Sequence, residues 1–149
     1  MNRAMTVLVG LCLLLGGLGL PSTAEASGKV GVKVQVVHAT KANSKVDPKV
    51  KRLAKHYRRL GYTGFRLLDS EQVQLAPKSK KTVSIIGGRE MTITVLSRGP
   101  KRARLRVEVQ GKRGKLVDTT VSIKRNGMMI VAGPRHKNGI LVLPIWARY

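Results

Sequence analysis

Apolar and polar residues alternate along much of this chain, and the alternation has the period of a β-strand. In residues 30–38 every second residue, from Val30 to Val36, is a valine, and most residues between them are polar or glycine. Leu105, Val107 and Val109 alternate in the same way with charged or polar neighbours. A period of two places one side of a strand against a core and the other side in water. Both stretches are therefore predicted to be strands with one buried face.

A helical period follows Asp47 and Pro48. An aspartate at the N-cap accepts hydrogen bonds from unpartnered backbone N–H groups, and proline suits the first helical position because its missing donor would have no partner there. Apolar residues then recur along one helix face, at Val50, Leu53, Ala54, Tyr57 and Leu60. Gly61 suits the left-handed residue that ends many helices. The pattern predicts one amphipathic helix over residues 48–60.

After Gly61 the chain alternates short β-like runs with turn residues. The predicted strands are residues 65–68 together with 73–75, then 82–86, 91–96, 103–109, 116–123, 128–131 and 140–146. Gly87-Gly88 and Asn126-Gly127 are the strongest hairpin signals, because the favoured hairpin turns need positive φ angles. We expect an α+β fold in which the N-terminal strand and the helix precede an antiparallel meander of about six strands, forming a curved sheet or a small barrel. Residues 32–37 are expected to pair with residues 141–145 at the far edge of this sheet.

Residues 1–26 have the organisation of a secretory signal peptide. Arg3 gives a positive start, residues 5–20 are almost wholly apolar, and Ala24-Glu25-Ala26 resembles a cleavage site. The apolar run is shorter than the ~20 residues of a membrane-spanning helix, so we expect cleavage rather than anchoring. Residues 27–149 would then form a single basic α+β domain without a transmembrane span, periplasmic or secreted. Because Cys12 is the only cysteine, that domain would lack disulfides, which favours a bacterial origin.

The formal net charge is +22 at pH 7, and residues 1–26 do not alter it because they carry one arginine and one glutamate. Such a charge favours association with polyanions. The expected partners are an anionic envelope polymer or anionic lipid headgroups, although a basic surface without any partner would show the same pattern. The residues expected to bind the polyanion lie on the polar helix face and in basic clusters, most of them near turns: Lys51, Arg52, Lys55, Arg58, Arg59, Lys80, Lys81, Arg102, Arg104, Arg106, Lys112, Arg113, Arg135 and Lys137.

The sequence offers little for catalysis. After residue 26 there is no cysteine, and no serine lies in a G-x-S-x-G elbow. His38, His56 and His136 lack the spacing of a metal site. We therefore expect no enzyme activity and no catalytic, metal or cofactor site. The rival hypothesis is a hydrolase that uses Asp69 or Glu71 with a histidine, and it requires a carboxylate deeply buried beside that histidine.

Short motifs in the chain resemble those of known groups. Residues 126–134, Asn-Gly-Met-Met-Ile-Val-Ala-Gly-Pro, resemble the Gly-strand-Gly segment of bacterial secretins, in which a glycine precedes a short apolar strand that ends in Gly-Gly. Here Gly133 is followed by Pro134 in place of the second glycine of that final pair. The wider layout resembles small uncharacterised exported proteins of delta-proteobacterial type. That layout consists of a V-x-V-x-x-V-x-A-T strand (32–40), a D-P helix start, R-L-L (66–68), G-G-R (87–89) and a G-P-R-x-x-x-G tail (133–139). The second resemblance spans most of residues 27–149 but implies no functional residue.

Together these patterns predict a non-enzymatic, exported bacterial envelope protein that binds an anionic surface polymer or lipid headgroups. One alternative is an accessory subunit of an envelope or secretin-type secretion assembly, acting through protein contacts such as strand addition at a sheet edge. A second alternative is an extracellular nucleic-acid binder, which is less favoured because aromatic residues for base stacking are few.

Overall fold

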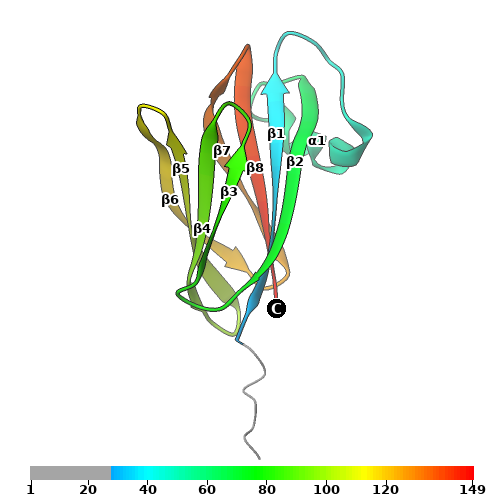
Figure 1. Cartoon of the computed structure of the whole chain (residues 1–149). Coiled ribbons are helices and arrows are strands. Elements are labelled where there is room, and N and C mark those ends of the chain that lie inside the picture. Colours follow the sequence, from blue (N-terminus) through cyan, green and yellow to red (C-terminus); the bar gives the residue numbers. More distant parts are fainter. Residues whose placement is uncertain (1–27) are drawn as a thin grey trace, which may run out of the picture.

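The computed structural model describes residues 28–149, so the predicted signal peptide and its cleavage site lie outside the described residues. The described chain forms two four-stranded antiparallel sheets that pack face to face, with one short helix beside them (Figure 1). Within residues 28–149, no helix has both the length and the apolar character needed to cross a membrane.

The two sheets follow the order of an up-and-down meander. Sheet A contains, in spatial order, β2 (Gly64–Leu75), β1 (Val30–Thr40), β8 (Gly139–Arg148) and β7 (Gly127–His136). Sheet B contains β3 (Lys80–Ile85), β4 (Arg89–Arg98), β5 (Arg102–Gly111) and β6 (Gly114–Lys124). Within each sheet, strands that follow one another in the chain are neighbours, and β8 returns to pair with β1. The meander is open between β2 and β3 and between β6 and β7, so it is a sandwich rather than a closed barrel.

This architecture corrects the expected fold. Each predicted run overlaps a strand, but the strands number eight in two sheets rather than about six in one, and a single short helix makes the fold mainly β rather than α+β. The runs 65–68 and 73–75 are joined in one strand, β2, which continues through the polar residues between them. The ladder between β1 and β2 has a register shift between Leu67 and Asp69, opposite Val36 and Val37, which is typical of a β-bulge.

The two strongest turn signals have different outcomes. Gly87 and Gly88 adopt φ angles of 84° and 65° and connect β3 to β4 as predicted. Asn126 also has a positive φ of 55°, but Gly127 already belongs to β7, and β6 and β7 lie in different sheets. The predicted hairpin at Asn126-Gly127 is therefore wrong. A positive φ reverses the chain sharply whether or not the strands on either side hydrogen-bond to each other.

The predicted pairing of the first strand with the last is confirmed. Val34 lies opposite Ile145 and Val37 opposite Val142 in an antiparallel ladder. The predicted edge position is wrong, because β1 lies between β2 and β8. β1 and β8 are consequently the two central strands of sheet A, and most of their residues are buried.

The core consists of two apolar clusters on opposite sides of sheet A. The larger cluster fills the space between the sheets and includes Val36 and Leu143 from sheet A and Leu105 from sheet B. The smaller cluster lies between the outer face of sheet A and the helix, and includes Val37 and Tyr57. Consecutive residues of a strand point to opposite faces. Val36 and Val37 therefore contribute to different clusters, and sheet A is buried on both sides where the helix covers it.

The helix begins as predicted but is shorter. The Asp47 carboxylate accepts a hydrogen bond from the Lys49 backbone N–H at 2.9 Å, a 3-10 turn follows at Pro48–Val50, and α1 extends over Lys51–Arg58. Gly61 has the expected positive φ of 80°. Leu60, expected on the buried face, is 49% exposed because α1 ends at Arg58.

Candidate functional site

The predicted cations of the helix form an exposed basic surface. α1 lies on the outer side of sheet A (Figure 1), and its buried residues Ala54 and Tyr57 face the sheet. Because apolar residues occupy one face of α1, its basic residues lie on the opposite face. Lys51, Arg52, Lys55, Arg58 and Arg59 are all exposed. This part of the predicted site is brought together by the local helix alone.

A second group of cations lies at the end of the sandwich where the β1–β2 connection, with the helix, and three hairpin turns meet (Figure 1). We call this end the helix end. It carries Lys112 and Arg113 in the β5–β6 turn and Arg135 and Lys137 beside the β7–β8 turn. The β7–β8 turn is joined to sheet B by Arg89, whose Nη2 donates to the Arg135 carbonyl oxygen at 2.8 Å.

The helix-end cations form one continuous band. A side chain added at Gly88 would meet the Lys112 side chain, so the β3–β4 and β5–β6 turns are in contact. Lys41, Tyr62 and Lys137 line one pocket, and Lys41 also lies beside Gly61 at the end of the helix. We define the helix-end band as Lys41, Arg89, Lys112, Arg113, Arg135 and Lys137.

Other predicted cations lie away from this band. Lys80 and Lys81 begin β3 and Arg102 begins β5, all at the opposite end of the sandwich, whereas Arg104 is exposed on the outer face of sheet B. Further cations of that end pack on the chain itself, because Arg98 and Arg125 lie 4.7 Å and 5.7 Å from the centre of the Tyr149 ring. The predicted residues therefore form several separate groups rather than one surface.

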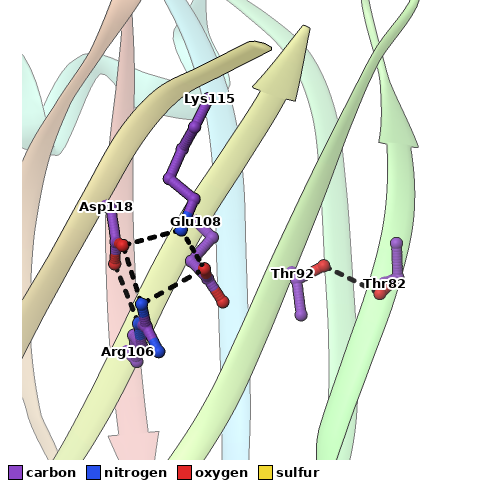
Figure 2. A network of polar contacts seen from close by, with 6 residues as sticks. All are labelled: Thr82, Thr92, Arg106, Glu108, Lys115 and Asp118. Carbon is purple, nitrogen blue, oxygen red and sulfur yellow. Dashed lines mark hydrogen bonds and ion pairs between the residues drawn. The ribbon is translucent and has the colours of Figure 1, made fainter.

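Arg106, one of the predicted polyanion-binding residues, belongs to a network of ion pairs. Its guanidinium donates two hydrogen bonds to Asp118, at 2.8 Å and 2.7 Å, and lies 3.4 Å from Glu108. Lys115 contacts the same two carboxylates, each at 2.8 Å (Figure 2). Two positive and two negative groups thus compensate one another on the outer face of sheet B. Arg106 is consequently a weak choice for a polyanion contact.

The ionisation of this network follows its geometry. Hydrogen bonds from Arg106 and then Lys115 hold the pKa of Asp118 well below its usual range. The hydrogen bonds to Asp118 and Glu108 in turn raise the pKa of Lys115. Among residues 28–149, the four charged groups of this network form the only ion pairs.

A separate polar contact lies on the same face of sheet B. Thr82 and Thr92 share a hydrogen bond of 2.8 Å between their hydroxyls across β3 and β4 (Figure 2).

Two pockets lie on either side of Asn138 in the β7–β8 turn. The first has a volume of about 440 Å³ and is lined by His38, Thr40, Asn43, Lys45, Val46, Asp47, Phe65, Arg66 and Asn138. The second has a volume of about 360 Å³ and is lined by Lys41, Tyr62, Arg135, Lys137, Asn138, Gly139 and Ile140. The second pocket contains three cations and no carboxylate. Arg135 and Lys137 were predicted from their basic cluster, whereas Lys41 and Tyr62 were not, because each is a single residue outside any basic cluster.

Two of the three histidines come together, which their spacing did not suggest. The His38 Nε2 lies 3.2 Å from the His136 carbonyl oxygen, and the two rings are 5.5 Å apart and nearly perpendicular. His56 is exposed on the helix. Burial lowers the pKa of His136, and the neighbouring His38, Arg89 and Lys137 lower it further. Across residues 28–149, no group of three or more His, Cys, Asp or Glu side chains could hold a metal ion.

The carboxylates of the rival hydrolase do not have the environment that it requires. Glu71 is exposed and Asp69 is only partly buried in β2. The Asp69 carboxylate accepts a hydrogen bond from the adjacent Ser70 N–H at 2.7 Å. Neither carboxylate hydrogen-bonds to a histidine within the described chain.

Comparisons with known proteins give no relative for this chain: no family model, no curated protein and no solved structure matches it.

Proposed function

We propose that this protein binds an anionic surface polymer of the bacterial envelope, and that the contact surface is the basic helix face together with the helix-end band. The proposed location rests on the signal-peptide pattern of residues 1–26. The proposed partner rests on charge. A polymer is favoured over a small anion because the cations extend over the helix and across three turns.

The observation that carries this proposal is the lack of internal compensation at the helix end. Every Lys and Arg of residues 28–149 other than Arg106 and Lys115 is without an ion pair. The carboxylates closest along the chain to this end are Asp47, which accepts the Lys49 backbone N–H, and Glu90. A band of uncompensated positive charge produces a potential that attracts polyanions.

Strand addition, the alternative mode, is opposed by the chemistry of three sheet edges. β3 carries the exposed Lys80 and Lys81, and β7 contains Pro134 at a register shift. The edge of β2 is partly covered, because Val46 forms a bridge with Phe65. Lysines, prolines, bulges and covering segments are the features by which natural sheets avoid pairing with another chain. These features favour binding through side-chain charge over binding through a strand edge.

The proposal is tested by measuring retention of the protein on immobilised polygalacturonate and polyphosphate at increasing salt. Retention is expected to fall steeply from about 0.1 M to about 1 M salt, because the Debye length falls from ~10 Å to ~3 Å. A variant with Lys51→Glu, Arg52→Glu, Lys55→Glu and Arg59→Glu should lose retention already at the lowest salt.

The matched control changes the same number of charges at the predicted residues outside this surface, through Lys80→Glu, Lys81→Glu, Arg102→Glu and Arg104→Glu. It is expected to retain most of the binding, because the helix face and the helix-end band are intact. Equal loss in both variants would show that only net charge matters. Preferred binding to phosphatidylglycerol vesicles or to single-stranded DNA, or salt-insensitive capture, would each contradict the proposed partner.

A further inference from the structure

From the geometry of the second pocket we infer that it binds one anionic sugar unit, with Lys41, Arg135 and Lys137 contacting the acidic group and Tyr62, Asn138 and Ile140 contacting the sugar ring. The inference rests on the proposed function and adds to it the unit of the polymer that is recognised. The acidic group is a carboxylate or a phosphate, and the experiment below distinguishes these two sources.

The walls of the pocket are held in place before any ligand binds. The Thr40 hydroxyl donates to the Asn138 carbonyl oxygen at 3.2 Å, and Arg89 holds the Arg135 carbonyl from the other side. A side chain at Gly139 would collide with the Ala39 carbonyl oxygen, so the β7–β8 turn lies directly against β1. A site fixed in this way loses little conformational entropy when it binds a ligand.

The electrostatics of the pocket suit an anion. Three cations line it, and no acidic side chain does. The same positive charge is felt by the adjacent His136, whose pKa is lowered first by burial and then by His38, Arg89 and Lys137. Charge-assisted hydrogen bonds from arginine and lysine are the strong contacts that proteins use for carboxylates and phosphates.

The rest of the lining suits a sugar rather than a bare anion. The Asn138 side-chain amide has no hydrogen bond to any residue of the described chain, so it can donate to one hydroxyl and accept from another. Tyr62 and Ile140 present partly exposed apolar surface to the pocket, which a C–H face of a sugar ring can cover. The Lys41 ammonium lies over the Tyr62 ring, with Nζ 5.6 Å from the ring centre, and this cation–π contact holds the lysine at the pocket. The volume of about 360 Å³ is within the range of small-molecule pockets.

The experiment is an NMR titration of the whole protein with glucuronic acid, glucose 6-phosphate, glucose and inorganic phosphate. We expect the amide signals of Gly139 and Ile140 to shift with glucuronic acid or glucose 6-phosphate, and whichever binds more tightly identifies carboxylate or phosphate as the acidic group. Glucose and inorganic phosphate should bind at least about tenfold more weakly, because each offers only part of the contacts. The pKa of His136 should rise when the anionic sugar binds, since a nearby negative charge favours the protonated ring.

Two variants and one matched control decide the assignment. Lys137→Asn should weaken binding of the anionic sugar about tenfold or more, and asparagine tolerates the positive φ of 49° at this position. Arg135→Gln should have a similar effect. The control is Lys78→Asn, because Lys78 is also a turn lysine with positive φ (68°) but lies in the connection between β2 and β3. It should bind as the unchanged protein does.

The inference is overturned if neither anionic sugar shifts the pocket signals, if glucose or inorganic phosphate binds equally well, or if Lys78→Asn weakens binding as much as Lys137→Asn. Retention on polygalacturonate or polyphosphate distinguishes a failure of the pocket assignment from a failure of the proposed function. If retention persists without any sugar binding, the pocket assignment fails and the proposed function stands. If retention is absent as well, both fail.

Discussion

The outer faces of the two sheets differ, although both inner faces share one core. The outer face of sheet A is covered by α1 near the helix end, where Val37, Tyr57 and Val142 form a second buried cluster. The outer face of sheet B has no covering element in the described chain and carries the ion-pair network and the pair of threonine hydroxyls (Figure 2). The two sheets therefore differ in what they contact: sheet A packs against both sheet B and the basic helix, whereas sheet B packs only against sheet A.

The difference is visible in the central strands. In β5 the residues alternate between buried and exposed or partly exposed positions, as expected of a strand with one wet face. In β1 nearly every residue is buried, and in β8 the consecutive residues from Leu141 to Ile145 are all buried, which is typical of strands covered on both faces. The free energy of unfolding is therefore expected to depend strongly on the apolar contacts at the outer face of sheet A and only weakly on the polar contacts at the outer face of sheet B.

The largest expected effect comes from removing the ring that joins the helix to sheet A. Tyr57 is fully buried and packs against Phe65 with ring centres 5.1 Å apart. Tyr57→Ala should lower the free energy of unfolding by about 3 kcal/mol, since it removes a large buried side chain and leaves a cavity. Thr92→Ala, on the outer face of sheet B, should change it by no more than about 0.5 kcal/mol. Urea denaturation of both variants measures the contrast, and equal losses would show that the two faces do not differ.

A smaller effect of opposite sign is expected for Tyr57→Phe. The Tyr57 hydroxyl is buried and finds no partner among residues 28–149, and burial raises the pKa of this phenol well above its usual range. An unpartnered buried hydroxyl costs free energy, so its removal should stabilise the protein by about 1 kcal/mol while leaving the ring packing in place. The thermal unfolding midpoint reports the change. A marked loss of stability would mean that the hydroxyl has a partner.

The smallest effect is expected at the ion-pair network of sheet B. Asp118→Asn removes one carboxylate from four exposed or partly exposed groups, and surface ion pairs contribute little. The pKa of Asp118 is lowered in the folded state. Its contribution to stability is therefore complete above the ordinary carboxyl pKa near ~4 and is lost as the pH falls below that value.

Two measurements identify this contribution. The stability difference between Asp118→Asn and the unchanged protein should be small at neutral pH and should disappear in about 1 M salt or in strong acid. Denaturation curves at three pH values and two salt concentrations are sufficient. A difference that persists in high salt would show that Asp118 acts through packing rather than charge.

The sequence predicted local structure well where one period or one cap was sufficient. The helix start at Asp47, its end near Gly61 and the alternation of β5 depend on neighbours within a few residues. It predicted the grouping of the basic residues only in part. The helix cations are gathered as expected, but Arg106 is paired with Asp118, and Lys80 and Lys81 lie at the opposite end from Arg135.

The sequence by itself therefore determined the positions of the strands, the one helix with its caps, and the excess of positive charge. The tertiary structure alone decided that the meander opens into two sheets at Asn126-Gly127, because a turn signal does not specify hydrogen bonding between the strands it connects. It also decided that His38 meets His136, 98 residues away along the chain, and that Lys41 and Tyr62 meet the β7–β8 turn. The order of the elements predicted that β8 pairs with β1, but which side chains meet there depends on the register of that pairing and on the neighbouring turns, and no local pattern encodes these.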